Sequence, residues 1–161
     1  MRLKSTAYEE GQTMPRRFGC DGENISPDFS WYDTPKEAKS FVLILHDPDA
    51  PMKDGFTHWL VYNIPAGVRG LNENISKEGM PEIAQYGLQG KNSEGTLGYT
   101  GPCPPSGVHR YFARFYALKR ILDLPPGADT KEVQRAMEHE IIEEAELMGT
   151  YEKKTPARVA S

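Results

Sequence analysis

The chain has 161 residues, with 19 Lys and Arg against 23 Asp and Glu, so its formal net charge is −4. This length suits one domain, spanning residues 1–161, and the charge balance has no basic cluster of the kind that binds nucleic acid. No apolar run approaches the roughly 20 residues of a membrane-spanning helix, and the chain starts without an apolar leader, so we expect a cytoplasmic protein without integral membrane association.

Short strands joined by ordered loops are expected, since the chain holds 15 Gly and 13 Pro. Runs rich in β-branched and aromatic residues predict strands at 29–32, 40–47, 56–65 and 109–122. The last three should form the centre of a sheet. The long Gly- and Pro-rich stretch at 91–106 should form an ordered wall, because prolines at 102, 104 and 105 stiffen it.

An amphipathic helix packed on the sheet is predicted from Asp129 to Gly149. Apolar residues recur every three or four positions along one face, at Val133, Met137, Ile141, Ala145 and Met148. Asp129 or Thr130 can cap the N-terminus, and Glu132 can bond back to Asp129. Gly149 suits the left-handed residue that ends a helix.

The two cysteines, Cys20 and Cys103, are too few for a disulfide scaffold, and neither belongs to a CxxC pair. A disulfide between them is open, because the spacing of two cysteines in a sequence does not fix their distance. Free thiols are the expectation, since cytosolic thiols normally stay reduced.

Polar residues at strand ends are the candidate functional set. Asp47 and Asp49 follow a core strand, His58 lies inside FTHWL, and His109 begins the strand after the proline-rich loop. A buried His or Asp needs a hydrogen-bond partner, so these residues either satisfy one another or line a cavity. P-loop, GxSxG and HExxH motifs are absent.

Longer motifs carry a family resemblance. DPDAP at 47–51, HWLVYNIP at 58–65 and GPCPPSGVHRYFARFYAL at 101–118 resemble the phosphatidylethanolamine-binding protein family, also called Raf kinase inhibitor proteins. The likeness extends to CDGENISPDFSW at 20–31 and AELMGTY at 145–151, and it looks like the compact bacterial and archaeal branch. It implies an all-β fold with a C-terminal helix, built as an antiparallel two-sheet β-sandwich.

The resemblance also implies a small anion pocket and no cofactor. Its residues would be Asp47, Asp49, His58, His109 and Tyr111, with Gly101, Cys103 and Pro105 at the rim and a backbone N–H of Cys103 facing the anion. Phe56 would replace a Trp common in the family. Implied partners are a small anionic or phosphorylated ligand, a kinase or serine protease as protein target, and a second copy in a homodimer.

Two other functions stay open beside this non-catalytic binding protein. Asp47, His58 and His109 could form a two-histidine, one-carboxylate metal site of a metal-dependent enzyme. Ser106 or Cys103 could act as a nucleophile with His109. In the binding interpretation, the carboxylate of Asp47 instead orients an imidazole that donates to the ligand. Eukaryotic relatives carry a longer C-terminal segment over the pocket, so regulation by that segment and Raf kinase inhibition are not expected here.

Overall fold

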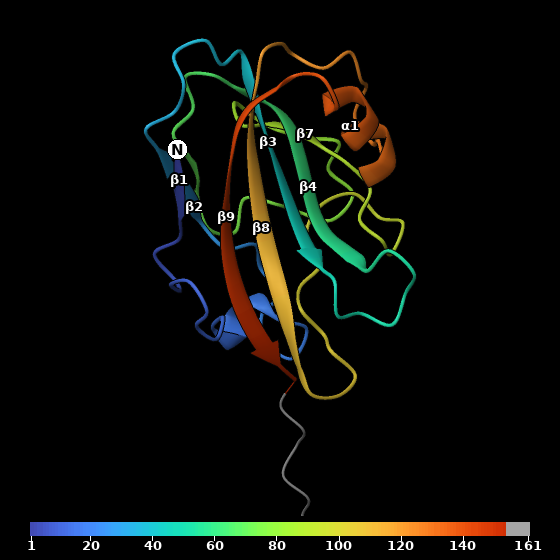
Figure 1. Cartoon of the computed structure of the whole chain (residues 1–161). Helices are drawn as coiled ribbons and strands as arrows, with labels where there is room; N and C mark the ends of the chain where they lie inside the picture. Colours follow the sequence, from blue (N-terminus) through green and yellow to red (C-terminus); the bar gives the residue numbers. More distant parts are fainter. Residues whose placement is uncertain (154–161) are drawn as a thin grey trace, which may run out of the picture.

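The structure, a computed structural model, describes residues 1–153. Most of its elements are strands, and Figure 1 shows the long ones running side by side, with the one α-helix of residues 1–153 packed against them. The elements in chain order are β1 (Arg2–Lys4), the 3-10 helix η1 (Arg16–Phe18), β2 (Phe29–Tyr32), β3 (Ser40–Asp47), β4 (Phe56–Pro65), β5 (Gly70–Leu71), β6 (Glu82–Ile83), β7 (Gly87–Gln89), β8 (Val108–Leu118), α1 (Thr130–Met137) and β9 (Ile141–Glu152).

The strands form two antiparallel sheets, which confirms the predicted sandwich. The larger sheet has the order β6-β7-β4-β3-β8-β9 and the smaller one β1-β2-β5. The three strands predicted for the sheet centre lie there as β4, β3 and β8, although β8 ends at Leu118 and not at Leu122. β3 is buried along almost its whole length, as its continuous apolar sequence indicated.

The main core fills the space between the two sheets. Trp31 of β2 stacks on Phe115 of β8 with ring centroids 4.3 Å apart, and Phe41 of β3 stacks on the same ring at 5.1 Å. Aromatic pairs at these distances gain stability beyond their buried area. This core fixes the small sheet over the inner face of β3, β4 and β8.

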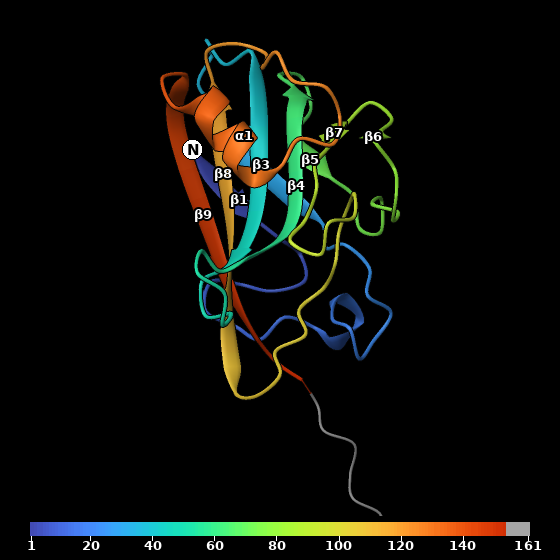
Figure 2. The same ribbon diagram turned by 90° about the vertical axis from the view of Figure 1, so that its right-hand side faces the viewer.

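A second core lies on the other face of the large sheet, under α1. Figure 2 shows the helix on one side of the sheet and β1 on the other. Val133 and Met137 of the helix are buried among Val42, Ile44 and Leu60 of the sheet. The molecule therefore has three layers, and a cavity at the inner face is separated from the helix by the sheet.

The predicted helix is right at its start and wrong in its second half. Asp129 is the N-cap, and its side chain and that of Glu132 form the expected capping box. The helix ends at Met137, however, and residues 141–152 form β9, which pairs with β8 along its length. Sheet pairing outweighs the helix propensity of the Glu, Ala and Leu residues in this segment.

Gly149 is consequently not a helix cap. It lies inside β9, where a Cβ atom would come 2.7 Å from side-chain atoms of both Met14 and Tyr8. Leu147, Gly149 and Tyr151 are buried while their neighbours are more exposed, which is the two-residue period of a strand. The helix is also not the C-terminal element that the sequence suggested.

Cys20 and Cys103 form a disulfide, contrary to the expectation of free thiols. The fold brings the Cα atoms to 5.3 Å across 83 residues of sequence.

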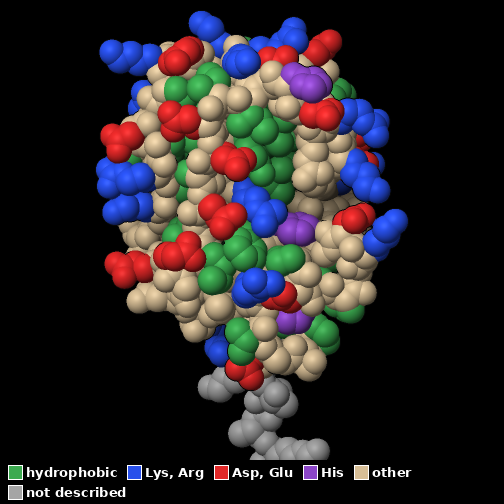
Figure 3. Space-filling model, in the orientation of Figure 1, with side chains coloured by type: hydrophobic (Ala, Val, Ile, Leu, Met, Phe, Trp, Pro, Cys, Tyr) green, Lys and Arg blue, Asp and Glu red, His purple; other side chains and the backbone are tan. Residues whose placement is uncertain are grey.

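On the face in Figure 3, Lys and Arg side chains are interspersed with Asp and Glu and form no single basic patch. Within residues 1–153, no helix is long and apolar enough to span a membrane.

Candidate functional site

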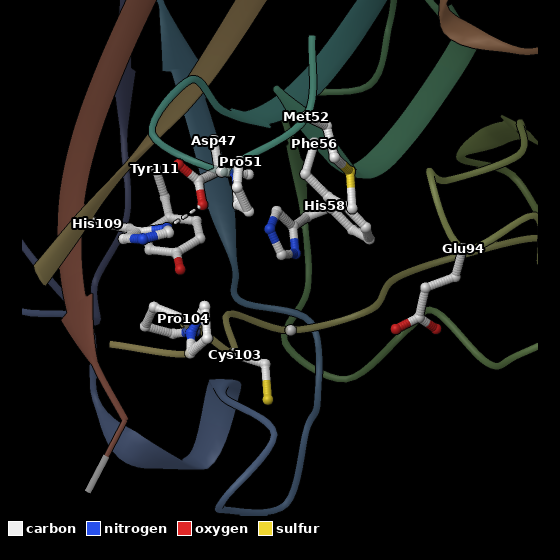
Figure 4. A pocket seen from close by; sticks show the side chains of 13 residues that line it. Asp47, Pro51, Met52, Phe56, His58, Glu94, Cys103, Pro104, His109 and Tyr111 are labelled. Carbon is white, nitrogen blue, oxygen red and sulfur yellow. Dashed lines mark hydrogen bonds and ion pairs between the residues drawn. The ribbon is translucent and has the colours of Figure 1, made fainter. Parts of the chain in front are cut away.

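A cavity of about 240 Å³ lies at the end of the large sheet where β3 stops and β4 begins. Figure 4 shows its side chains converging from these two strands, from β8 and from the loop before β8. Its lining residues are Asp47, Ala50, Pro51, Met52, Phe56, His58, Glu94, Gly101, Cys103, Pro104, Pro105, His109 and Tyr111. Most of this surface is apolar, and a few polar groups converge on it, which is the usual composition of a ligand site.

Asp47 lies at the end of β3 and is only 2% exposed. Its Oδ1 accepts a hydrogen bond from the backbone N–H of Asp49 at 2.8 Å, which closes the turn after the strand. Its Oδ2 lies 2.6 Å from Nδ1 of His109, and because a carboxylate accepts, Nδ1 carries the proton. Asp47 therefore orients the imidazole of His109, and both its oxygens are already engaged.

A β-bulge aims His58 into the cavity. Leu45 pairs with Trp59 and His46 pairs with Thr57, so His58 is the extra residue of β4 at this point. Bulges of this kind redirect a side chain next to a site. Nδ1 of His58 lies 2.7 Å from the backbone carbonyl of Thr100, and the Thr100 N–H donates back to the His58 carbonyl at 2.9 Å.

This contact fixes the tautomer of His58. A carbonyl oxygen can only accept, so Nδ1 carries the proton and the other ring nitrogen, Nε2, is an acceptor in the neutral ring. Nε2 is buried and has no hydrogen-bond partner in the protein. Burial lowers the pKa of His58 to about 4, and His46 adds to this effect. The Thr100 carbonyl, Asp47 and the Gly101 backbone oppose it only in part, so the ring is neutral at neutral pH.

Tyr111 of β8 supplies a second buried polar atom. The residue is fully buried, and its hydroxyl has no hydrogen-bond partner in the protein. Its ring meets that of His58 edge-on at 5.1 Å and lies 6.5 Å from that of His109. Burial raises the pKa of Tyr111, with Asp47 adding to the effect, so the hydroxyl stays protonated and can donate.

The loop before β8 forms one wall of the cavity, as its prolines suggested. The Gly101 N–H donates to Oδ1 of Asn24 at 2.7 Å, and the Cys20 N–H donates to the Pro102 carbonyl at 3.0 Å. Glycine is required at 101, because a Cβ atom there would overlap the Phe18 carbonyl oxygen. The Cys20–Cys103 disulfide fastens the same wall to the N-terminal segment.

Asp49 is the one predicted pocket residue that the fold does not bring to the cavity lining. Its carboxylate receives two hydrogen bonds from the Arg110 guanidinium, at 2.8 and 3.0 Å, and one from the Arg110 N–H at 2.9 Å. These bonds lower the pKa of Asp49 to about 2. Asp49 thus joins the turn after β3 to β8, beside the site.

The sequence did not single out Ala50, Pro51, Met52, Glu94 or Pro104 as lining residues. The first three continue the turn after Asp47, and their closeness to Asp47 in the sequence could have identified them as lining residues. Glu94 is exposed and stands apart from the buried polar cluster in Figure 4. It reaches the rim through the folding of the 91–106 loop, which no local pattern predicts.

The charges around the cavity are unusual for an anion site. Of its lining residues, all within the described chain, none is Lys or Arg, whereas two are carboxylates, Asp47 and Glu94. The nearby Arg110 is paired with Asp49.

The two catalytic alternatives find little support in this arrangement. Among residues 1–153, no three His, Cys, Asp or Glu side chains are grouped so that they could hold a metal ion. Cys103 is bonded to Cys20, so its sulfur is not a thiolate nucleophile. Ser106 is exposed and does not line the cavity.

Comparisons with known proteins give a consistent result. The sequence profile described as "Phosphatidylethanolamine-binding protein" matches residues 4–152. A UPF0098 protein of Methanothermobacter thermautotrophicus is 52% identical over 153 residues, which cover 95% of this chain and 99% of the relative. The crystal structure of a phosphatidylethanolamine-binding protein homologue from Chlamydia trachomatis superposes with a TM-score of 0.86 at 42% identity, covering 95% of this chain and 97% of the other. Escherichia coli YbcL, a member of the mammalian PEBP family, gives a TM-score of 0.84 at 31% identity, with 95% and 98% covered.

Proposed function

The chain belongs to the phosphatidylethanolamine-binding protein family, and we propose that it is a non-catalytic binding protein whose pocket takes a phosphate-bearing or similar small anionic ligand. This family membership is what the sequence motifs predicted. The ligand class and the assignment of the pocket residues are the proposal.

One observation carries the proposal: two polar atoms face the cavity without a partner. Nε2 of His58 and the hydroxyl of Tyr111 are both buried and unbonded. A buried polar atom without a hydrogen bond costs about 1–3 kcal/mol, so a folded protein rarely keeps two of them in one place. A ligand with an oxygen acceptor for the Tyr111 hydroxyl and an O–H donor for Nε2 of His58 would satisfy both.

Each residue of the pocket has a role in this proposal. Tyr111 donates its hydroxyl proton to a ligand oxygen. In this proposal His109, oriented by Asp47, binds the ligand as an imidazolium, because only the protonated ring can donate from Nε2 while Nδ1 donates to Asp47. Gly101, Cys103 and Pro105 form the rim, with the Cys103 N–H as a further donor. Asp49 acts through the turn that it stabilises and not through direct contact.

Protein partners belong to the same proposal. A kinase or serine protease is the proposed target, supported by the family resemblance. A homodimer is also proposed, and sedimentation at tens of micromolar should give a species near twice 18.1 kDa. A single species of 18.1 kDa at that concentration would reject the dimer.

Thermal unfolding with and without methyl phosphate tests the ligand class. At a hundredfold excess over the dissociation constant, a ligand should stabilise the folded protein by about 2.7 kcal/mol. Asp47→Asn, which keeps the side-chain shape, should remove most of this stabilisation, and so should His109→Ala. Glu144→Gln, an exposed change in β9, should leave it intact. No stabilisation of the unaltered protein, or full stabilisation of both pocket variants, would contradict the proposal.

A further inference from the structure

The pocket offers its ligand an acceptor as well as donors. Nε2 of His58 is held as an acceptor, because Nδ1 donates to the Thr100 carbonyl at 2.7 Å. A fully ionised anion has no hydrogen to give to this nitrogen. The lone pair of Nε2 would instead face the negative oxygens of such an anion, which is unfavourable.

The net charge of the residues that line the cavity also disfavours a fully ionised anion. Even with a charged His109, the carboxylates of Asp47 and Glu94 leave the lining with a net charge of −1. A dianion placed in this mostly apolar cavity would lose its hydration without gaining a compensating positive charge. A group of lower charge is accommodated more easily.

We infer, on the basis of the proposed function, that the pocket selects a phosphate monoester in its singly protonated form, with the P–O–H donating to Nε2 of His58. The two unprotonated oxygens then accept from the Tyr111 hydroxyl and from His109. His58 is thus a specificity residue for protonation state, and the neutral ring expected from its burial supports that role. The chemistry shared by all accepted ligands is one acidic O–H beside an ionised oxygen.

Phosphate suits this requirement at neutral pH better than other acids. The second ionisation of a phosphate monoester has a pKa of about 6, so the monoanion is readily available. Carboxylic acids ionise near pH 4 and lose their hydrogen well below neutrality. A sulfate monoester keeps the shape but carries no proton at neutral pH, and a phosphate diester has no O–H.

Several groups other than the ligand could take up a proton on binding. The titratable groups around His58 are Asp47 and His46 of β3, His109 and Tyr111 of β8, and Glu94 at the rim. A pH dependence of affinity would therefore not identify the proton's position. The test must observe the phosphate and the imidazole directly.

The experiment compares three small tetrahedral ligands: methyl phosphate, methyl sulfate of the same size, and dimethyl phosphate, which has one more methyl group and no O–H. Calorimetry at pH 7 should give an affinity for methyl phosphate at least tenfold above the other two. In ³¹P NMR titrations, the bound phosphate should remain the monoanion at least one pH unit above its free ionisation. In ¹⁵N NMR, Nε2 of His58 should stay unprotonated in the free and bound protein.

His58→Asn is the matched variant, because the Asn amide can still donate to the Thr100 carbonyl while the Nε2 acceptor is gone. Its preference for methyl phosphate over methyl sulfate should fall below threefold. If this variant does not fold, the NMR measurements on the unaltered protein decide.

The contrary outcomes separate the inference from the function on which it rests. Methyl sulfate binding within twofold of methyl phosphate, a bound dianion, or a bound His58 imidazolium would overturn the inference and leave the binding function in place. A tenfold preference that persists in His58→Asn would also overturn it. If none of the three ligands binds, the proposed function fails and the inference fails with it.

Discussion

His58 and Trp59 are neighbours in β4 and both have buried rings. The single ring nitrogen of Trp59 has a hydrogen-bond partner within the protein, whereas one of the two ring nitrogens of His58 has none. Trp59 Nε1 donates to Oε1 of Gln89 at 2.8 Å. The same oxygen accepts from Ser76 Oγ at 2.6 Å, and the Gln89 amide nitrogen donates to the Met80 carbonyl at 3.1 Å. His58 has one satisfied nitrogen and one that faces the cavity unpartnered.

The difference separates a structural polar cluster from a binding site. A buried group whose hydrogen bonds are complete stabilises the fold and has nothing left to offer a ligand. A buried group left incomplete costs stability, and it is available to whatever enters the cavity. Removing a residue from the Gln89 cluster should therefore harm the fold, whereas removing one from the pocket should harm binding.

The largest expected effect is on the structural side of this comparison. Gln89→Leu would leave the buried Trp59 donor unsatisfied and would remove the part-buried bonds of Gln89 to Ser76 and Met80. At about 1–3 kcal/mol for the buried donor and about 1 kcal/mol for each of the other bonds, the free energy of unfolding should fall by about 4 kcal/mol. Urea denaturation measures this, and methyl phosphate should still bind to the folded fraction. A fall in the free energy of unfolding of less than about 1 kcal/mol would contradict the distinction between a structural Gln89 cluster and a binding pocket.

Acid should destabilise the protein through His58, with an effect of about 3 kcal/mol. The pKa of this residue is about 4 in the folded state, against about 6.5 in an unfolded chain. Between these values the unfolded state binds more protons, so stability is complete above pH 6.5 and is lost as the pH falls to about 4. The His58→Asn variant has no titrating group at this position. The carboxylates are the same in both proteins, so their pH-dependent contribution cancels when the two free energies of unfolding are subtracted.

Urea midpoints of the two proteins at pH 7.5 and pH 4.5 provide the measurement. The stability difference between the unaltered protein and His58→Asn should shift by about 2–3 kcal/mol toward the variant at the lower pH. Parallel pH profiles would mean that His58 is not held neutral by burial.

The smallest effect on stability is expected from Tyr111→Phe. The variant removes a hydroxyl that has no partner, so the free energy of unfolding should change by less than about 0.5 kcal/mol or rise. Tyr8→Phe is the matched control, because Tyr8 is also buried with an unpartnered hydroxyl but does not line the cavity. A loss above about 1.5 kcal/mol in Tyr111→Phe alone would indicate a structural hydrogen bond at that hydroxyl.

Much of the fold was predictable, because its central strands have local sequence signals. The continuous apolar run of β3 and the proline at the end of β4 predicted the bounds of these two strands, and the structure has the same bounds. The segment 141–149 was wrongly predicted as helix, because residues 141, 145 and 148 have a helical spacing. Its actual conformation depends on pairing with β8, which lies about 30 residues earlier in the chain. The Cys20–Cys103 bond likewise depends on a contact across 83 residues.

The site was predictable as a set of residues but not as a set of roles. Family motifs gave Asp47, His58, His109 and Tyr111, and these four residues line one cavity in the structure. The tautomer of His58 depends on the Thr100 carbonyl, which a distant loop brings into contact. The exclusion of Asp49 depends on Arg110, which becomes its neighbour through the pairing of strands.

The binding of methyl phosphate to Tyr111→Phe and Tyr8→Phe, measured side by side by calorimetry at pH 7, tests the central claim most directly. Both variants lose one buried, unpartnered hydroxyl, and Tyr111 alone lines the cavity. The account predicts that Tyr111→Phe weakens binding at least tenfold while Tyr8→Phe binds within twofold of the unaltered protein. Equal affinity in the two variants would contradict it, because the ligand would then not reach the Tyr111 hydroxyl.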